Sequence, residues 1–143
     1  RGVQTRVLFN LLLVCLFVSA ATSFVGPSFL KEPPSRVDFA NETGARIDCS
    51  AGGSPPPNIS WLSGDGKPVG SIPETRELLA NGSLLFPPFR PSGYRHDVHA
   101  ATYRCVAENT VGRIHSRDVR VRAGEYNSHT NILLVFNSVY LQK

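Results

Sequence analysis

Apolar and polar residues alternate in short runs over most of the chain, and clusters of proline and glycine separate these runs. A period of two is typical of a β-strand with one buried face. Residues 45–51 and 101–108 show the pattern most clearly. Shorter runs predict further strands at 29–31, at 37–39, around Ile59 and Trp61, around Leu84 and Phe86, and at 113–122. Short strands between turn residues predict an all-β sandwich.

The breaks between the runs have signals of their own. Pro33-Pro34 divides the first strand into the runs 29–31 and 37–39. The prolines within 52–57 end the strand expected at 45–51, because proline cannot donate to a sheet. Asn81-Gly82 predicts a tight turn in which both residues have positive φ.

Four side chains have spacings that resemble those of an immunoglobulin-type sandwich. Trp61 follows Cys49 by twelve residues, Cys105 follows it by 56, and Tyr103 lies two before Cys105. In that fold a disulfide joins the two sheets, the indole packs against it, and the tyrosine hydroxyl bonds nearby backbone. The resemblance implies an antiparallel β-sandwich with a Cys49–Cys105 disulfide and a core that contains Trp61 and Tyr103. The split first strand indicates the intermediate (I-set) subtype.

The first 23 residues have the pattern of a signal peptide. Arg1 and Arg6 precede a fifteen-residue apolar run, and small residues at 21–23 suit cleavage before Phe24. A membrane-spanning helix needs about 20 apolar residues, so an anchor is the weaker interpretation. Residues 24–123 are then the I-set domain.

Residues 124–143 form a tail outside the predicted domain. Gly124-Glu125-Tyr126 can be encoded by a splice-donor sequence, which suggests that the tail is translated intron. The chain contains no methionine, which suggests a fragment of a longer product.

Composition narrows the class further. Removing the signal peptide takes Cys15 with it and leaves two cysteines, the even number that an oxidising compartment favours. It also leaves 13 basic and 11 acidic residues, a net charge of +2 in place of +4. This balance does not indicate binding to nucleic acid, and no membrane insertion is expected after signal removal.

Three sequons predict N-glycosylation at Asn41, Asn58 and Asn81, each in or beside a predicted turn. Catalytic, cofactor and metal sites are not expected. His96 and His99 lack a second ligand pair, and Ser92, Asp97 and His99 lack the strained turn of a serine nucleophile. We therefore expect no enzyme activity.

The run 113–122 is the most basic strand. Its apolar parity changes between Ile114 and Val119, which predicts a β-bulge near Arg117-Asp118. Its four arginines either protect an edge strand by charge or form a binding stripe.

Longer motifs resemble one receptor family. Residues 53–61 and 105–112 fit signatures of I-set domains, and 26–33, 85–90 and 94–100 resemble the first immunoglobulin domain of the arthropod Down syndrome cell adhesion molecule family. The likeness runs from about residue 26 to residue 123. One departure occurs at His99, where many such domains have an aspartate that pairs with an arginine, so that ion pair is not expected here.

The resemblance implies an extracellular module of a neuronal or immune adhesion receptor. Its partners would be immunoglobulin domains of the same or a related receptor on an apposed cell, in homophilic recognition, axon guidance and dendrite self-avoidance. This chain would be secreted, and the presumed full-length receptor would lie in the plasma membrane of axons. The alternative is a secreted single-domain protein that binds a ligand or serves immune recognition.

Overall fold

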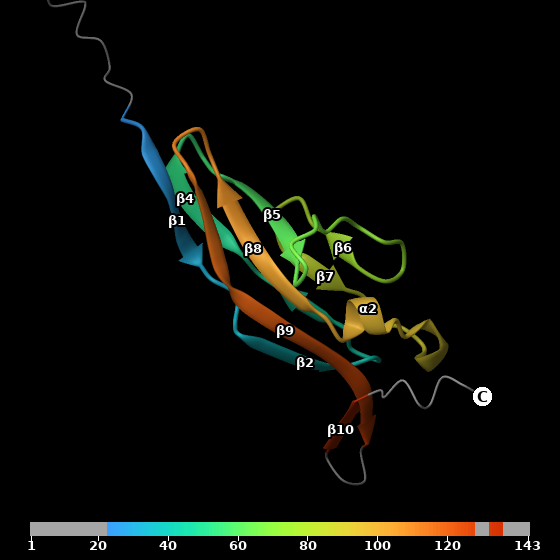
Figure 1. The fold of residues 1–143 in the computed structure, drawn as a ribbon. Coiled ribbons are helices and arrows are strands. Elements are labelled where there is room, and N and C mark those ends of the chain that lie inside the picture. Colours follow the sequence, from blue (N-terminus) through green and yellow to red (C-terminus); the bar gives the residue numbers. More distant parts are fainter. Residues whose placement is uncertain (1–22, 128–131, 136–143) are drawn as a thin grey trace, which may run out of the picture.

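The computed structural model describes residues 23–127 and 132–135, which form a two-layered β-sandwich (Figure 1). The strands are β1 (Val25–Lys31), β2 (Arg36–Ala40), β3 (Ala45–Ile47), β4 (Ser50–Ser54), β5 (Asn58–Ser63), β6 (Glu77–Leu78), β7 (Leu84–Phe86), β8 (Thr102–Glu108), β9 (Arg113–Asn127) and β10 (Ile132–Val135). Two short helical turns, η1 (Pro91–Gly93) and α2 (His96–His99), lie between β7 and β8.

One layer is the sheet β10-β9-β8-β5, to which β2 adds by pairing with β9. The other layer consists of the sheet β3-β7-β6 and the pair β1-β4. This pair extends the layer because β4 follows β3 directly in the chain. The β5–β8, β8–β9 and β3–β7 pairs are antiparallel, whereas β2 runs parallel to β9. The expected all-β, antiparallel sandwich is confirmed.

The first strand divides between the two layers, as the proline pair predicts. β1 pairs with β4 in one layer, and β2 pairs with β9 in the other. Pro33 is buried where the chain crosses. A proline suits this crossing because it has no N–H to leave unpaired.

The Cys49–Cys105 disulfide joins the layers at the centre of the core, with the two Cα atoms 6.5 Å apart. Trp61 and Tyr103 belong to the same buried cluster and are 0% and 1% exposed. The indole Nε1–H donates to the Gly82 carbonyl at 2.7 Å, so the one polar atom of this side chain is satisfied.

Two local expectations are wrong. The strand expected at 45–51 is two strands, β3 and β4, which pair with different neighbours on either side of Asp48. The carboxylate of Asp48 accepts hydrogen bonds from Lys31, Arg46 and Ser83, three donors from different parts of the layer. In the Asn81-Gly82 turn only Gly82 has positive φ, of 87°.

The predicted bulge lies in β9 opposite Cys105. The register between β8 and β9 shifts there: Arg104 pairs with Asp118 but Val106 pairs with His115, so two residues of β9 lie opposite Cys105. The Cys105 N–H donates to the Ser116 hydroxyl at 2.9 Å instead of to a carbonyl. The Ser116 hydroxyl therefore satisfies the backbone N–H of the disulfide-bonded cysteine at the bulge.

β9 continues beyond Ala123, where the domain was expected to end. Residues 124–127 remain in the strand, and β10 pairs with them antiparallel. The backbone N–H of Asn41 also bonds the Gly124 carbonyl at 2.8 Å. The expected signal peptide lies outside the described residues, apart from its last residue, Ser23.

Gly82 and Gly66 offer a matched test of the packing at this turn. Both have positive φ, of 87° and 81°, but a Cβ on Gly82 would lie 2.7 Å from Ile59, whereas one on Gly66 would meet nothing within 4 Å. Gly66→Ala should cost about 1–2 kcal/mol from backbone strain alone. Gly82→Ala should cost roughly 1–3 kcal/mol more because of the steric clash. Urea unfolding followed by Trp61 fluorescence measures both; equal costs would contradict the packing described here.

Candidate functional site

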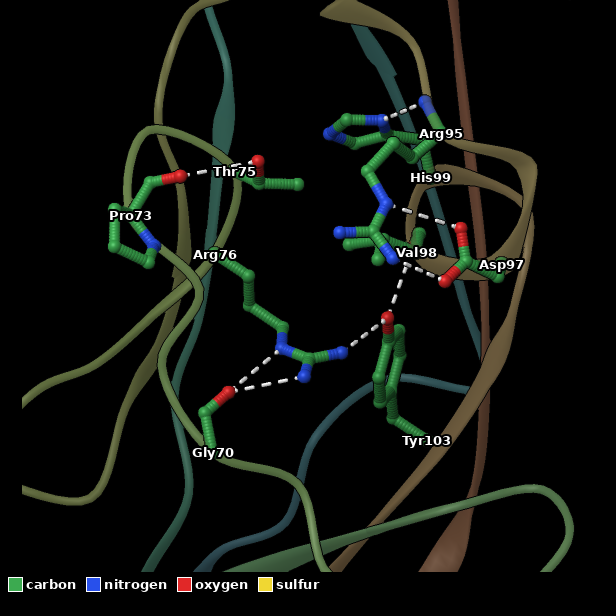
Figure 2. A network of polar contacts seen from close by, with 9 residues as sticks. All are labelled: Gly70, Pro73, Thr75, Arg76, Arg95, Asp97, Val98, His99 and Tyr103. Carbon is green, nitrogen blue, oxygen red and sulfur yellow. Dashed lines mark hydrogen bonds and ion pairs between the residues drawn. The ribbon is translucent and has the colours of Figure 1, made fainter.

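A polar network closes one end of the sandwich around the tyrosine that precedes the second cysteine (Figure 2). The Tyr103 hydroxyl donates to the Val98 carbonyl at 2.8 Å, which is the expected bond to nearby backbone. It accepts a hydrogen bond from Arg76 Nη1 at 3.0 Å. The corner therefore ties β8 both to α2 and to the segment before β6.

Arg76 is a buried cation, 8% exposed. Its Nε and Nη2 both donate to the Gly70 carbonyl, at 3.1 and 2.9 Å, and its guanidinium carbon lies 5.5 Å from the centre of the Tyr103 ring. No carboxylate in the described part of the chain lies within ion-pair distance of it. Carbonyl, hydroxyl and aromatic ring together stand in for the acidic partner.

His99 lies four residues before Tyr103, at the position named above as an aspartate in many immunoglobulin domains. Its side chain is 0% exposed. Its Nδ1 accepts the Arg95 backbone N–H at 2.9 Å, so the proton of the neutral ring is on Nε2. The ring stacks on Phe89, with centroids 4.0 Å apart and planes 13° apart, and also lies near Tyr94. The corner therefore contains an uncharged aromatic side chain at this position and no ion pair to Arg76 among the described residues.

Burial lowers the pKa of His99 from 6.5 to about 4. The Thr75 backbone opposes this effect, while the positive charges of Arg95 and Arg76 add to it. A second cation beside Arg76 would cost energy, and the neutral imidazole avoids that cost.

The geometry does not assemble catalytic or metal-binding chemistry at this end. The Asp97 carboxylate binds the Arg95 guanidinium at 2.6 Å, and His99 Nδ1 is occupied by backbone. Within residues 23–127 and 132–135 no group of three His, Cys, Asp or Glu side chains could hold a metal ion. His129 lies outside the described residues. None of the described helices is long and apolar enough to cross a bilayer.

The three sequon asparagines have different surroundings. Asn58 and Asn81 are exposed, at the start of β5 and in the turn that packs on Ile59, so both lie on the β5 side of the sandwich. Asn41 is 4% exposed and its Nδ2 donates to the Phe89 carbonyl at 2.9 Å. That nitrogen is the atom to which a glycan is attached, so the folded packing conflicts with the predicted modification of Asn41.

Most arginines of β9 are ion-paired. Arg113 pairs with Glu108, Arg117 with Glu32 and Arg122 with Asp38, at 3.0, 2.9 and 3.1 Å. Arg120 has no ion pair or side-chain hydrogen bond to another described residue and lines a groove with Ser35, Arg36, Thr102 and Asp118. The basic strand is therefore an ion-paired surface with one exception.

Two features, one at the buried corner and one on the β9 surface, could not be predicted from the sequence. Arg76 has no periodic or motif signal of its own, because its burial depends on Gly70 and Tyr103, which lie in other segments. Arg36 and Arg120 are adjacent only through the parallel β2–β9 register. Neither could be recognised before the strand pairing was established.

The fold is that of an immunoglobulin domain of the intermediate set. It has two facing sheets, an intersheet disulfide beside a buried tryptophan, a tyrosine corner and a first strand split between the sheets. No protein-family model matches the chain. It is 54% identical over 98 residues to the cell adhesion molecule Dscam1 of Drosophila melanogaster, and 37% identical over 95 residues to human DSCAM. The chain belongs to the Dscam family of immunoglobulin domains.

Solved structures of Dscam immunoglobulin domains have the same fold as this chain. The N-terminal four immunoglobulin domains of Dscam1 isoform 4.44 match with a TM-score of 0.70 at 51% identity, over 72% of this chain and 26% of that one. A structure that describes the basis of Dscam isoform specificity matches with a TM-score of 0.67 at 54% identity, over 69% of this chain and 26% of that one. The Dscam1 alignment covers 68% of this chain and 5% of the relative, and the human one 66% and 5%. The relatives are named as cell adhesion molecules, which agrees with the expectation of no enzyme activity.

The buried imidazole makes stability depend on pH. In the unfolded chain His99 takes up a proton near its ordinary pKa of 6.5, whereas the folded chain resists protonation until about pH 4. The unfolded state therefore binds more protons between these values, so the free energy of unfolding should fall as pH falls from 6.5 to 4, by at most roughly 1 kcal/mol per pH unit.

His99→Asn is the matched control, since its amide oxygen can still accept the Arg95 N–H but does not titrate. Urea unfolding at several pH values should show the advantage of the wild type over H99N shrinking as pH falls through this window. Parallel pH curves for the two proteins would show that His99 is not buried as a neutral ring.

Proposed function

We propose that this chain is an extracellular recognition module of a cell-surface adhesion receptor, where it contributes to homophilic contact between cells. One observation carries the proposal: the 54% identity to Dscam1 spans 98 residues, close to the length of the described domain. At that identity the layer arrangement, the disulfide and the corner are expected to be shared. Protein partners follow from the adhesion names of the relatives.

The domain boundaries are part of the proposal. Residues 1–23 would be removed as a signal peptide, 24–123 would be the recognition module, and 124–143 would be a tail whose first residues extend β9. The disulfide supports an extracellular location, because such bonds persist in oxidising compartments. The exposed sequons at Asn58 and Asn81 support passage through the secretory pathway.

The glycosylation proposal distinguishes the three sequons. Asn58 and Asn81 should carry glycans, since both side chains are exposed. Asn41 should be unmodified in the secreted, folded protein, since its amide nitrogen is buried and bonded to Phe89. Enzymatic deglycosylation in heavy-oxygen water, followed by peptide mass spectrometry, reports each position. A secreted chain with high occupancy at Asn41 would contradict the proposal.

A domain exchange tests the receptor role. The first immunoglobulin domain of the Drosophila Dscam1 ectodomain is replaced by residues 24–123 of this chain, and beads coated with the chimaera are assayed for self-aggregation. The chimaera should aggregate like the parent, because the shared fold presents its neighbours in the same geometry. Beads coated with this chain alone should show no strong clustering.

An ectodomain with an unrelated I-set domain at the same position is the control. It should be secreted but should cluster poorly. A chimaera that is secreted and monodisperse, yet fails to aggregate, would remove the proposed function.

A further inference from the structure

A groove of about 410 Å³ lies on the solvent-facing side of the β2–β9–β8 sheet. Its lining residues are Ser35, Arg36, Thr102, Asp118 and Arg120. Arg120 is directly opposite Arg36 on one neighbouring strand and Thr102 on the other, so the three side chains form one row across the sheet. Val119 and Val121, which alternate with this face, are 0% exposed, so the row faces outward.

The row places two like charges side by side. Arginines directly opposite each other on paired strands repel, which destabilises the pair unless an anion lies between them. Arg36 is drawn to Asp38 at 2.6 Å. Arg120 has no corresponding partner among the described residues, so one guanidinium of the pair is uncompensated.

Further donors surround the same space. Ser35 and Thr102 line the groove, and neither hydroxyl makes a side-chain hydrogen bond to another residue in the described part of the chain. A guanidinium and two hydroxyls therefore have unused donor capacity around one hollow. A planar carboxylate fits a guanidinium by two parallel N–H···O bonds and can accept further bonds from hydroxyls.

The surrounding charges favour a single carboxylate over an extended polyanion. Asp118 lines the groove and pairs with Arg104 at 2.6 Å, and Asp38 pairs with both Arg36 and Arg122. A sulfated polysaccharide chain would have to pass these two carboxylates. A glutamate or aspartate side chain needs only the space beside Arg120.

We propose that this groove binds the carboxylate of an acidic side chain from a protein partner, with Arg120 as its main contact and Thr102 and Ser35 as supporting donors. Asn58 and Asn81 lie on the β5 side of the sandwich, so glycans there would leave the β2–β9 side open. The inference deepens the proposed recognition function, because it names the chemistry that a partner would offer.

NMR titration of the ¹⁵N-labelled, folded chain tests the groove directly. The probe is N-acetyl-glutamate N-methylamide, and its neutral counterpart is N-acetyl-glutamine N-methylamide. The acidic probe should produce saturable shifts at the amides of Arg36, Thr102 and Arg120, and the neutral probe should not. Arg120→Gln should weaken binding about tenfold, as expected for loss of a charged hydrogen-bond partner, and Arg120→Lys should fall between the two.

Arg113→Gln is the matched control, because Arg113 is on the same strand but is already paired with Glu108. It should leave the titration unchanged, and a dispersed spectrum verifies that each variant is folded. Absence of saturable shifts, equal shifts with the neutral probe, or unchanged binding by R120Q would overturn the proposal. Tighter binding of a sulfated disaccharide at the same amides would assign the groove to sulfate and overturn it as well. The domain exchange tests the receptor role separately, so the two failures are distinguishable.

Discussion

The face-to-face packing of two sheets determines most of what this domain can be. Each layer has one apolar face, and neither face can stay in water, so the two must cover each other. The Cys49–Cys105 bond and Trp61 lie where this contact is densest. The inner faces of both sheets are buried against each other. Groups that recognise other molecules must therefore lie on the outer faces, along the edges or at the ends of the sandwich.

The buried corner shows how the same fold tolerates a change of chemistry. An aspartate opposite Arg76 would have formed a buried ion pair, whose desolvation cost can exceed its Coulombic gain. Here His99 fills the volume, stacks on Phe89 and remains neutral, while Gly70 and Tyr103 bind the guanidinium. The architecture thus depends on satisfying the arginine, and an acidic residue is one of several ways to do so.

Much of the architecture followed from sequence because rare residues mark its centre. Cys49, Trp61 and Cys105 can occur at these spacings in few folds, and alternation located the strands around them. The break between β3 and β4 did not follow, because it lies where the chain changes its pairing partner from β7 to β1, and Asp48 there binds donors from distant segments. Arg120 was visible only as one charge in a basic run. Its distinct surroundings arise from a register that joins residues 84 positions apart, which no local pattern records.

The split first strand has a mechanical consequence. β2 and β9 run parallel and pair over five residues, from Arg36 with Arg120 to Ala40 with Gly124. When the chain is pulled from the N-terminal side of β2 and the C-terminal side of β9, parallel strands slide along each other and do not peel apart. All of their hydrogen bonds then carry the load together. In the proposed adhesion receptor, tension between two cells would load this β2–β9 patch in shear.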